Sequence, residues 1–383
     1  MKIFLKIITF VLITFISINS LSYSKEKIKI GLLVPLSGTH QEIGQSIVKS
    51  VRLAVNKIDN DEIEIYPKDT KADPDETLKK AKELRDDKVK VVIGPVFNKS
   101  NLYLGQIEEI TFLSLTNKSI NKHKNVINSG INSSSQLKTI TKFQKETDLK
   151  KTIFLIPKND FINEVENGIK NSNIKLKKTY YYDTDPTKLT KQIEKITKYQ
   201  SRKKILEDEI KRLESLDDPS KENQIERLKK KDTLGKIGFD SIIISDFDET
   251  LKSITTSLLY TDVSSKRVNF ITLNQWFDES LLREASTQNL YFPSINRKNY
   301  EVFKNEYKSK FKNEPNQLSF LSYDLLGLVY YLVVKNNFEI NNKMFSKKST
   351  FKGKIGIFEI KNLKIEHRLN FYKIENNSFK KIF

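Results

Sequence analysis

The sequence contains no cysteine, and this absence excludes several classes of site at once. A chain without thiols forms no disulfide, holds no metal through thiolates, uses no cysteine nucleophile and carries no lipid on cysteine. Histidine is almost absent too, so a histidine metal centre would need His40, His123 and His367 to converge. We therefore expect no metal, no other cofactor and no lipoprotein anchor.

The body of the chain also lacks long hydrophobic runs. With 38% hydrophobic and 30% charged residues, the 383-residue chain can build a core but is too polar for a polytopic membrane protein. The exception is the amino-terminal end, where Lys2 and Lys6 precede an apolar run over residues 7–18 and the small residues Ser22 and Ser24. This pattern predicts a secretory signal peptide over residues 1–24 and a periplasmic body. The alternative is an uncleaved anchor, which would be the protein's only contact with the membrane.

Positive charge is in excess, with 67 Lys and Arg against 48 Asp and Glu and a formal net charge of +19. The excess is spread along the chain and is accompanied by no nucleic-acid-binding motif, so we expect no nucleic-acid partner. A field of this sign favours an anionic membrane or wall polymer as a neighbour without specifying one.

Apolar periodicity predicts alternating strands and helices. In the first half we expect strands at 27–35, 62–66, 89–93 and 111–115, helices at 41–58 and 75–86, and a further helix before the fourth strand. After a serine-rich break at 133–135, helices are expected at 137–147 and 161–171 and strands at 151–156, 177–182, 240–245 and 268–273, then helices at 298–311 and 319–334 and a β-rich tail from 351. This order predicts an α/β fold of two lobes, each a parallel sheet flanked by helices. We place the first lobe at 25–131 plus 291–350 and the second at 132–290 plus 351–383.

One stretch breaks this alternation. Between residues 188 and 232 the chain consists almost entirely of helix formers, with leucines and isoleucines three or four residues apart and an interruption at 216–220. We predict a helical-hairpin insertion over residues 201–232 in the second lobe. It would be either a solvated stalk or a docking arm, and the sequence leaves both open.

The segment around Asp246 resembles the first motif of haloacid-dehalogenase-type phosphatases, in which a strand delivers Asp-x-Asp-x-Thr. That resemblance implies Asp246 as nucleophile, Asp248 as acid and Thr250 as supporting hydroxyl around Mg²⁺. The later acidic pair that the metal requires is missing, and the motif comes two thirds of the way along the chain. A phosphatase is therefore the third hypothesis.

A wider resemblance covers most of the chain. The segments 30–38, 91–96, 114–117 and 322–325 (IGLLVPLSG, VVIGPV, SLTN and SYDL) occur in the order typical of type 1 periplasmic solute-binding proteins of the leucine/isoleucine/valine kind. The resemblance implies a binding protein rather than an enzyme, with its ligand at the carboxyl ends of the strands. Our candidate ligand-binding residues at these ends are Thr39, His40, Gln41, Asn98, Lys99, Ser100, Thr116, Asn117, Asp160, Phe161, Asp246, Gln275 and Trp276.

Two positions depart from the amino-acid-binding pattern. Phe161 and Ile162 stand where that family has Tyr-Gly, and Gln275 and Trp276 follow the strand after which a carboxylate is expected. A buried ammonium without a counter-charge is unfavourable, so these two positions argue against binding of a free amino acid.

The hairpin and the segments 231–240, 274–282, 303–324 and 353–358 are similar to the penicillin-binding protein activator branch of this fold. That resemblance implies a regulator whose partner is a peptidoglycan synthase, and this is our leading hypothesis. The alternative is a receptor that delivers an amino acid or another small carboxylated solute to an ABC permease.

Overall fold

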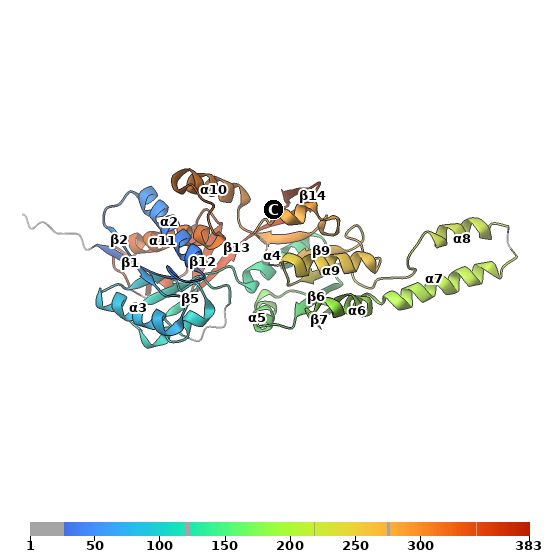
Figure 1. Ribbon diagram of the computed structural model, residues 1–383, viewed down its shortest axis with the longest axis horizontal. Coiled ribbons are helices and arrows are strands. Elements are labelled where there is room, and N and C mark those ends of the chain that lie inside the picture. Colours follow the sequence, from blue (N-terminus) through green and yellow to red (C-terminus); the bar gives the residue numbers. More distant parts are fainter. Residues whose placement is uncertain (1–26, 119–122, 218, 274–275, 342) are drawn as a thin grey trace, which may run out of the picture.

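The computed structural model describes residues 27–383 apart from 119–122, 218, 274–275 and 342. The predicted signal peptide, residues 1–24, and the predicted ligand residue Gln275 lie outside the described residues. Two α/β lobes lie side by side along the long axis, and a pair of helices projects from the second lobe (Figure 1).

The first sheet is parallel, with the strand order β2-β1-β3-β4-β5. Its strands are β1 (Ile28–Val34), β2 (Ile63–Asp69), β3 (Val91–Ile93), β4 (Thr111–Ser114) and β5 (Val126–Asn128). Alternate residues serve opposite faces: Leu32 packs with α2 (Gln41–Ile58) and α11 (Gln317–Lys335), whereas Leu33 packs with α3 (Pro74–Asp86). Because both faces are covered, the central strands β1 and β3 are largely apolar, whereas the edge strand β2 carries Glu64, Lys68 and Asp69.

The second sheet has the order β15-β14-β10-β9-β8-β6-β7. Its strands are β6 (Thr152–Pro157), β7 (Lys178–Tyr182), β8 (Ser241–Ile244), β9 (Asn269–Thr272), β10 (Tyr291–Ser294), β14 (Asn370–Glu375) and β15 (Ser378–Lys381). Strands β6 to β10 are parallel, and β14 and β15 add an antiparallel edge. The flanking helices are α4 (Ser133–Glu146), α5 (Ile162–Ser172), α6 (Pro186–Thr197) and α9 (Asp248–Tyr260). The predicted fold class, two parallel sheets flanked by helices, is confirmed.

Two lobe boundaries differ from the prediction. Strand β10 pairs with β9 and β14, so residues 291–294 belong to the second sheet and not to the first lobe. In the tail, β11 (Ser349–Lys352), β12 (Ile357–Lys361) and β13 (Lys364–Arg368) form a separate antiparallel sheet, preceded by α12 (Lys343–Ser346), and only the last two strands join the second sheet. Strand β10 is short and one of its partners, β14, is distant in sequence, whereas β11 to β13 pair with one another. Local patterning therefore does not reveal which sheet or lobe these strands join.

Local predictions also failed in two places. The helix expected between β3 and β4 is replaced by the short 3₁₀ turns η1 (Asn98–Asn101) and η2 (Leu104–Gln106). The serine-rich break is the first turn of α4, because the Asn132 side chain accepts a hydrogen bond from the Ser135 backbone N–H at 2.8 Å and caps the helix.

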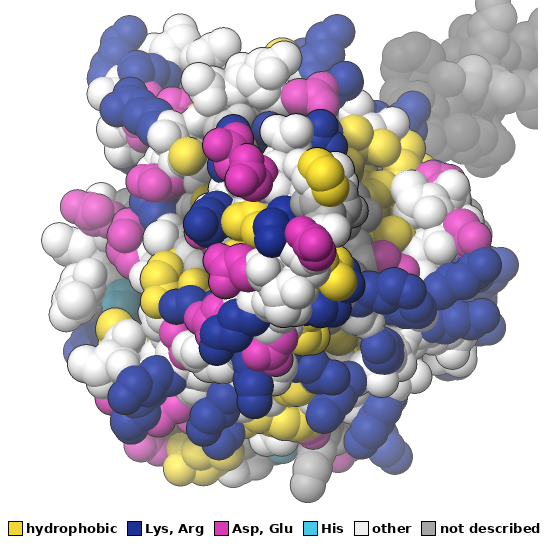
Figure 2. Space-filling view, turned by 90° about the vertical axis from the view of Figure 1, so that its right-hand side faces the viewer, with side chains coloured by type: hydrophobic (Ala, Val, Ile, Leu, Met, Phe, Trp, Pro, Cys, Tyr) yellow, Lys and Arg dark blue, Asp and Glu magenta, His cyan; other side chains and the backbone are white. Residues whose placement is uncertain are grey.

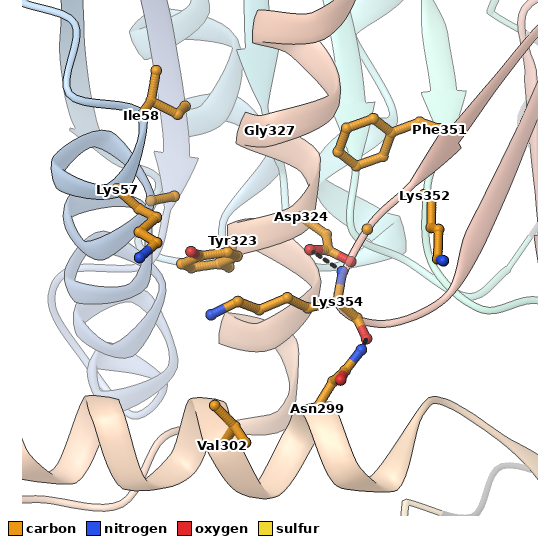
Figure 3. A pocket seen from close by; sticks show the side chains of 12 residues that line it. Lys57, Ile58, Asn299, Val302, Tyr323, Asp324, Gly327, Phe351, Lys352 and Lys354 are labelled. Atoms are coloured by element: carbon orange, nitrogen blue, oxygen red, sulfur yellow. Dashed lines mark hydrogen bonds between the residues drawn. The ribbon is translucent and has the colours of Figure 1, made fainter.

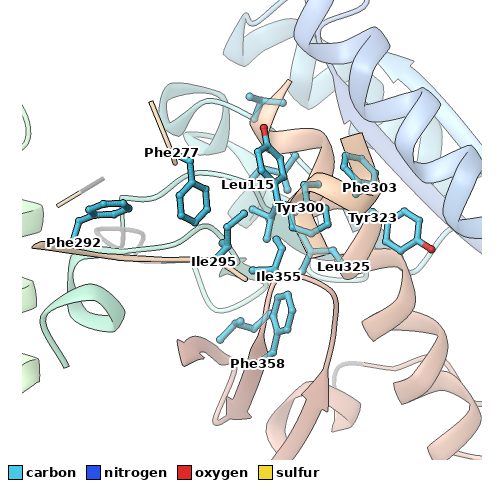
Figure 4. Packing of buried hydrophobic residues seen from close by; sticks show 14 of the residues in the cluster. Leu115, Phe277, Phe292, Ile295, Tyr300, Phe303, Tyr323, Leu325, Ile355 and Phe358 are labelled. Atoms are coloured by element: carbon cyan, nitrogen blue, oxygen red, sulfur yellow. The ribbon is translucent and has the colours of Figure 1, made fainter. Parts of the chain in front are cut away.

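The chain passes between the lobes after β5, after β10 and after β13. A single buried hydrophobic cluster continues across these crossings, from Leu115 in the first lobe to Phe277 and Phe292 in the second, with α10 (Arg297–Phe311) in between (Figure 4). Within the described residues, α11 has the length and apolarity of a membrane span, but most of it is buried against this cluster, as in the core helix of a soluble protein.

Candidate functional site

The loop between β1 and α2 is organised by Asp69, a residue that sequence analysis did not select. Its carboxylate accepts hydrogen bonds from the Leu36 backbone N–H at 2.8 Å and from the Ser37 hydroxyl at 2.5 Å. Burial alone would raise the pKa of Asp69, but hydrogen bonds from Ser37 and from the backbone of Lys71 and Leu36 lower it overall. The Asp69 carboxylate, at the end of β2, thus holds the loop that leads from β1 to α2.

Thr39, His40 and Gln41 are exposed at the amino-terminal end of α2, where no side chain caps the helix. The helix begins very close to the end of β1: a Cβ on Gly44 would lie 1.8 Å from the Pro35 carbonyl oxygen. Only glycine permits this approach, which sets the exposed first turn directly beyond the strand.

The loops after β3 and β4 bring part of the predicted set to the same edge of the sheet. The His40 ring lies 4.7 Å from the Phe97 ring, so the first turn of α2 is next to η1, where Asn98 and Lys99 are exposed. Ser100 is different: its side chain is buried, and its hydroxyl has no hydrogen-bond partner within the described part of the chain.

After β4 the two predicted ligand residues, Thr116 and Asn117, differ in exposure. Asn117 is exposed, whereas Thr116 is buried and packs against the first crossing, where a Cβ on Gly130 would lie 2.3 Å from the Thr116 carbonyl oxygen. Of the first-lobe candidates, Thr39, His40, Gln41, Asn98, Lys99 and Asn117 therefore present side chains to solvent.

In the second lobe, Asp160 and Phe161 lie in the turn between β6 and α5. Asp160 is exposed, whereas Phe161 is half-buried. The Phe161 ring contacts the cluster that includes Leu137 and Val165, on the face of the sheet covered by α4 and α5. Phe161 therefore contributes to the hydrophobic core of the second lobe and does not present its ring to a ligand at the strand ends.

Asp246 follows β8 and is 8% exposed. The Tyr182 hydroxyl donates a 2.5 Å hydrogen bond to Oδ2 of Asp246, and the Phe247 backbone N–H donates to Oδ1 at 3.0 Å. Burial raises the pKa of Asp246, although both hydrogen bonds oppose that shift. Both oxygens are engaged inside the protein, so Asp246 does not offer a free carboxylate to an ammonium group.

Trp276 is half-buried, and its ring lies 6.2 Å from the Tyr300 ring of α10 in an edge-to-face arrangement. It therefore belongs to the packing around the second crossing. Among the residues that the structure describes, no group of three His, Asp or Glu side chains could hold a metal ion.

Two buried polar residues, His367 and Asp324, lie outside the predicted set of ligand-binding residues. His367 of β13 is buried, and its Nε2 lies 2.8 Å from the Ser129 carbonyl oxygen at the first crossing, while its backbone N–H donates to the Ser135 hydroxyl of α4. Asp324 of α11 accepts hydrogen bonds from the Lys354 and Ile355 backbone N–H groups. A lone histidine and a helical aspartate carry no sequence signal of such a role.

The helical hairpin is the most prominent feature of the second lobe. Helices α7 (Tyr199–Glu214) and α8 (Lys221–Lys229) pack against each other and extend beyond the sheet (Figure 1). Their inward-facing apolar residues are Leu206, Leu213 and Ile225, while Ile205 and Leu216 are exposed. Figure 2 views this end of the molecule and shows lysine and arginine side chains mixed with acidic ones, with hydrophobic side chains in small separate patches.

Comparison with known proteins agrees with this architecture. Residues 27–200 match the model of a family of periplasmic binding proteins. The chain has the type 1 periplasmic binding protein fold. The resemblance predicted from the sequence is thereby confirmed. A comparison with curated proteins found no significant match.

Solved structures with this periplasmic binding protein fold include both kinds of protein that the sequence suggested. The C-domain of LpoA from Haemophilus influenzae, a regulator of PBP1A, has a TM-score of 0.61 at 13% identity and covers 93% of this chain and 100% of that chain. A protein assigned to branched-chain amino acid ABC transport in Rhodospirillum rubrum has a TM-score of 0.71 at 12% identity, with coverage of 93% and 100%. The leucine-binding protein LivK of Thermotoga maritima has a TM-score of 0.57 at 16% identity, with coverage of 93% and 98%. At these identities the similarity shows the fold alone.

Proposed function

We propose that this protein is a non-enzymatic periplasmic regulator of peptidoglycan synthesis, of the penicillin-binding protein activator kind, and that its hairpin (residues 199–232) contacts the synthase. The observation that carries the proposal is the way the hairpin is held. The Arg202 side chain at its base is 3% exposed, and its Nε donates a 3.0 Å hydrogen bond to the Thr197 carbonyl oxygen. Burial of a cation is unfavourable unless hydrogen bonds compensate it, so the hydrogen bonds of Arg202 hold the base of the hairpin in one orientation. A fixed orientation suits a contact surface better than it suits a solvated stalk.

The state of the predicted ligand residues supports the same proposal. A receptor for a free amino acid needs donors for the carboxylate and a counter-charge for the ammonium. In this chain Asp69 takes donors of the β1–α2 loop, and Asp246 is engaged by Tyr182 and Phe247. The similarity to the LpoA C-domain, a regulator of PBP1A in its own organism, is consistent with this assignment.

The test is recovery of peptidoglycan synthases from envelope extracts of the same organism with the purified mature protein as bait. The structure allows a clean deletion, because the Leu234 backbone N–H donates a 3.1 Å hydrogen bond to the Arg202 carbonyl oxygen. Residues 203–232 can therefore be replaced by a linker of about three Gly and Ser residues, which keeps Arg202 and Leu234 in place. We expect the full chain to recover a synthase and the deleted chain to lose it while keeping its melting temperature. Recovery of no synthase, or equal recovery by both chains, contradicts the proposal.

The second candidate is the substrate-binding component of an ABC transporter, which the similarity to the Rhodospirillum rubrum protein favours. Six predicted first-lobe residues remain exposed at the strand ends and could receive a small carboxylated solute. A thermal-shift screen against amino acids and short peptides separates the two functions, since a ligand at about 100 times its Kd stabilises its receptor by roughly 3 kcal/mol. A saturable shift with one solute would favour the receptor.

A further inference from the structure

A cavity of about 360 Å³ lies between α2, α10, α11 and the turn that joins β11 to β12, away from the strand ends described above. Its apolar walls are Ala54 and Ile58 of α2, Val302 of α10 and Phe351 of β11. Gly327 of α11 also lines the cavity, and a side chain there would crowd it, because a Cβ would already lie 3.2 Å from the Phe351 ring. The volume falls within the ~300–1,000 Å³ range of small-molecule sites.

Two lysines place their ammonium groups on one side of this cavity, and the ammonium of Lys354 is also paired with Glu306. Figure 3 shows the ends of the Lys57 and Lys354 side chains on the same side, next to the Tyr323 ring. The Lys354 ammonium lies 4.4 Å from the centre of that ring and 3.2 Å from a carboxylate oxygen of Glu306. Within the described part of the chain, no Asp or Glu oxygen lies within 4.0 Å of the exposed Lys57 ammonium.

The buried carboxylate of Asp324 does not neutralise these lysines by direct pairing. Its oxygens accept hydrogen bonds from the Lys354 backbone N–H at 2.8 Å and the Ile355 backbone N–H at 2.6 Å. Asp324 thus shapes the β11–β12 turn, and a third lysine, Lys352, lines the cavity on its other side (Figure 3).

We propose that this cavity binds a small carboxylate with an apolar body, with the carboxylate between Lys57 and Lys354 and the apolar part against Ile58, Val302 and Phe351. The combination of apolar walls and a few convergent polar groups is what positions such ligands in proteins. Lysine recognises the anion as a point charge and imposes no planar geometry, so the site selects for charge and size. The site is independent of the proposed function, because neither the hairpin nor the strand ends contribute to it.

The chain contains a built-in reporter for this site. Asn299 and Val302 line the cavity, and Tyr300 on the same helix packs against Trp276, the chain's only tryptophan. A ligand that moves α10 changes the surroundings of Trp276. The fluorescence of Trp276 therefore reports whether the cavity is occupied.

Phenylacetate is the probe, and phenylacetamide is its uncharged counterpart of nearly the same shape. Binding is measured by isothermal titration calorimetry on the full mature chain, with Trp276 emission recorded in parallel. We expect a Kd for phenylacetate below about 1 mM and binding of phenylacetamide at least about tenfold weaker. We expect Gly327→Leu, which fills the cavity, to abolish binding.

Lys57→Gln removes one charge from an exposed position and should leave folding intact, which makes it the decisive variant if Gly327→Leu lowers the melting temperature. It should weaken phenylacetate binding by about five- to tenfold. The matched control is Lys82→Gln, an exposed lysine of α3 that does not line the cavity, and it should bind as the unmodified chain does. The proposal is overturned if phenylacetate gives no saturable binding, if the acid and the amide bind equally, or if the two lysine variants behave alike.

Discussion

Nη1 of Arg202 donates a hydrogen bond to the Thr233 hydroxyl, 2.9 Å away, and so joins the two ends of the projecting hairpin. Thr233 passes the interaction on by donating to Oδ2 of Asp262 at 2.6 Å, and Nη2 of Arg202 donates to the Thr261 carbonyl oxygen at the end of α9. The hairpin is therefore tied to the body of the second lobe through one buried side chain.

Replacement of Arg202 by methionine should loosen the base of the hairpin. The change keeps most of the aliphatic stem but leaves the Thr197 and Thr261 carbonyl oxygens without this donor, and each such loss costs about 1–3 kcal/mol. We expect faster amide hydrogen exchange over residues 199–235, with little change in β6 and β8. Hydrogen-exchange mass spectrometry provides the measurement.

Arg212→Gln is the matched control on the same helix. Arg212 pairs with Glu209 one turn earlier, but its side chain is 57% exposed, and such surface pairs contribute about 0–1 kcal/mol. Exchange in this variant should resemble that of the unmodified chain. If Arg202→Met and Arg212→Gln exchange alike, Arg202 does not anchor the hairpin.

Gly353 and Asp324 should be energetically coupled. A Cβ on Gly353 would lie 2.2 Å from Oδ2 of Asp324, so Gly353→Ala must push the carboxylate away from the Lys354 and Ile355 backbone N–H groups. We expect Gly353→Ala to lower the free energy of unfolding by roughly 2 kcal/mol, measured by urea denaturation.

A double-mutant cycle gives this coupling a control. Asp324→Ala removes the acceptor and should itself destabilise, but it also makes room for the new methyl group. The double variant should therefore lose clearly less than the sum of the two single losses, by about 1 kcal/mol or more. If the losses in free energy of unfolding add strictly, Gly353 and Asp324 are not coupled and the clash is relieved by other groups.

Most of the regular structure could be predicted from the sequence, because burial on both faces of a parallel sheet produces continuous apolar strands and periodic helices. The helix expected at 41–58 has those bounds as α2, and the strand expected at 177–182 differs by one residue from β7. Strands β5 and β10 were missed because they contain only three and four residues, and β10 carries Pro293. The position of β10 also depends on β14, which is far away in the sequence.

The candidate site was less predictable, because position after a strand does not determine whether a side chain faces solvent. Asp160 and Phe161 are adjacent, yet one is exposed and the other packs on the α4–α5 face. Asp246 and Trp276 were chosen for their places in the order of elements, whereas Tyr182 and Tyr300, which contact them, come from other elements. Such pairs arise only once the sheet is assembled.

His367 should make the folded protein less stable as the pH falls below the ordinary histidine range. Burial lowers the pKa of His367 to about 4, from 6.5. Between these values the unfolded chain binds a proton that the folded chain does not, so the free energy of unfolding falls by roughly 1 kcal/mol for each pH unit. Above pH 6.5 both states are neutral at this residue, and it contributes no pH dependence.

The comparison with His367→Gln isolates this effect, because glutamine can still donate to the Ser129 carbonyl oxygen but does not titrate. Burial raises the pKa of Asp324 to about 6, which acts in the opposite direction, but both chains keep Asp324 and its contribution cancels. Urea denaturation at pH 7.5, 6 and 5 should show a steeper loss of stability in the unmodified chain. Parallel curves would mean that folding does not lower the pKa of His367.

Asp246 should have no catalytic role in phosphate hydrolysis. A phosphatase of the kind its motif resembles needs an accessible carboxylate that shares Mg²⁺ with other acidic side chains. Asp246 is instead engaged by Tyr182 and Phe247, and Asp248 lies in the first turn of α9, exposed to solvent. These residues do not fit the metal. With p-nitrophenyl phosphate and Mg²⁺, we expect the same rate for the unmodified chain, for Asp246→Asn and for buffer alone. Mg²⁺-dependent hydrolysis that disappears in Asp246→Asn but persists in Tyr182→Phe would contradict this and make the protein an enzyme.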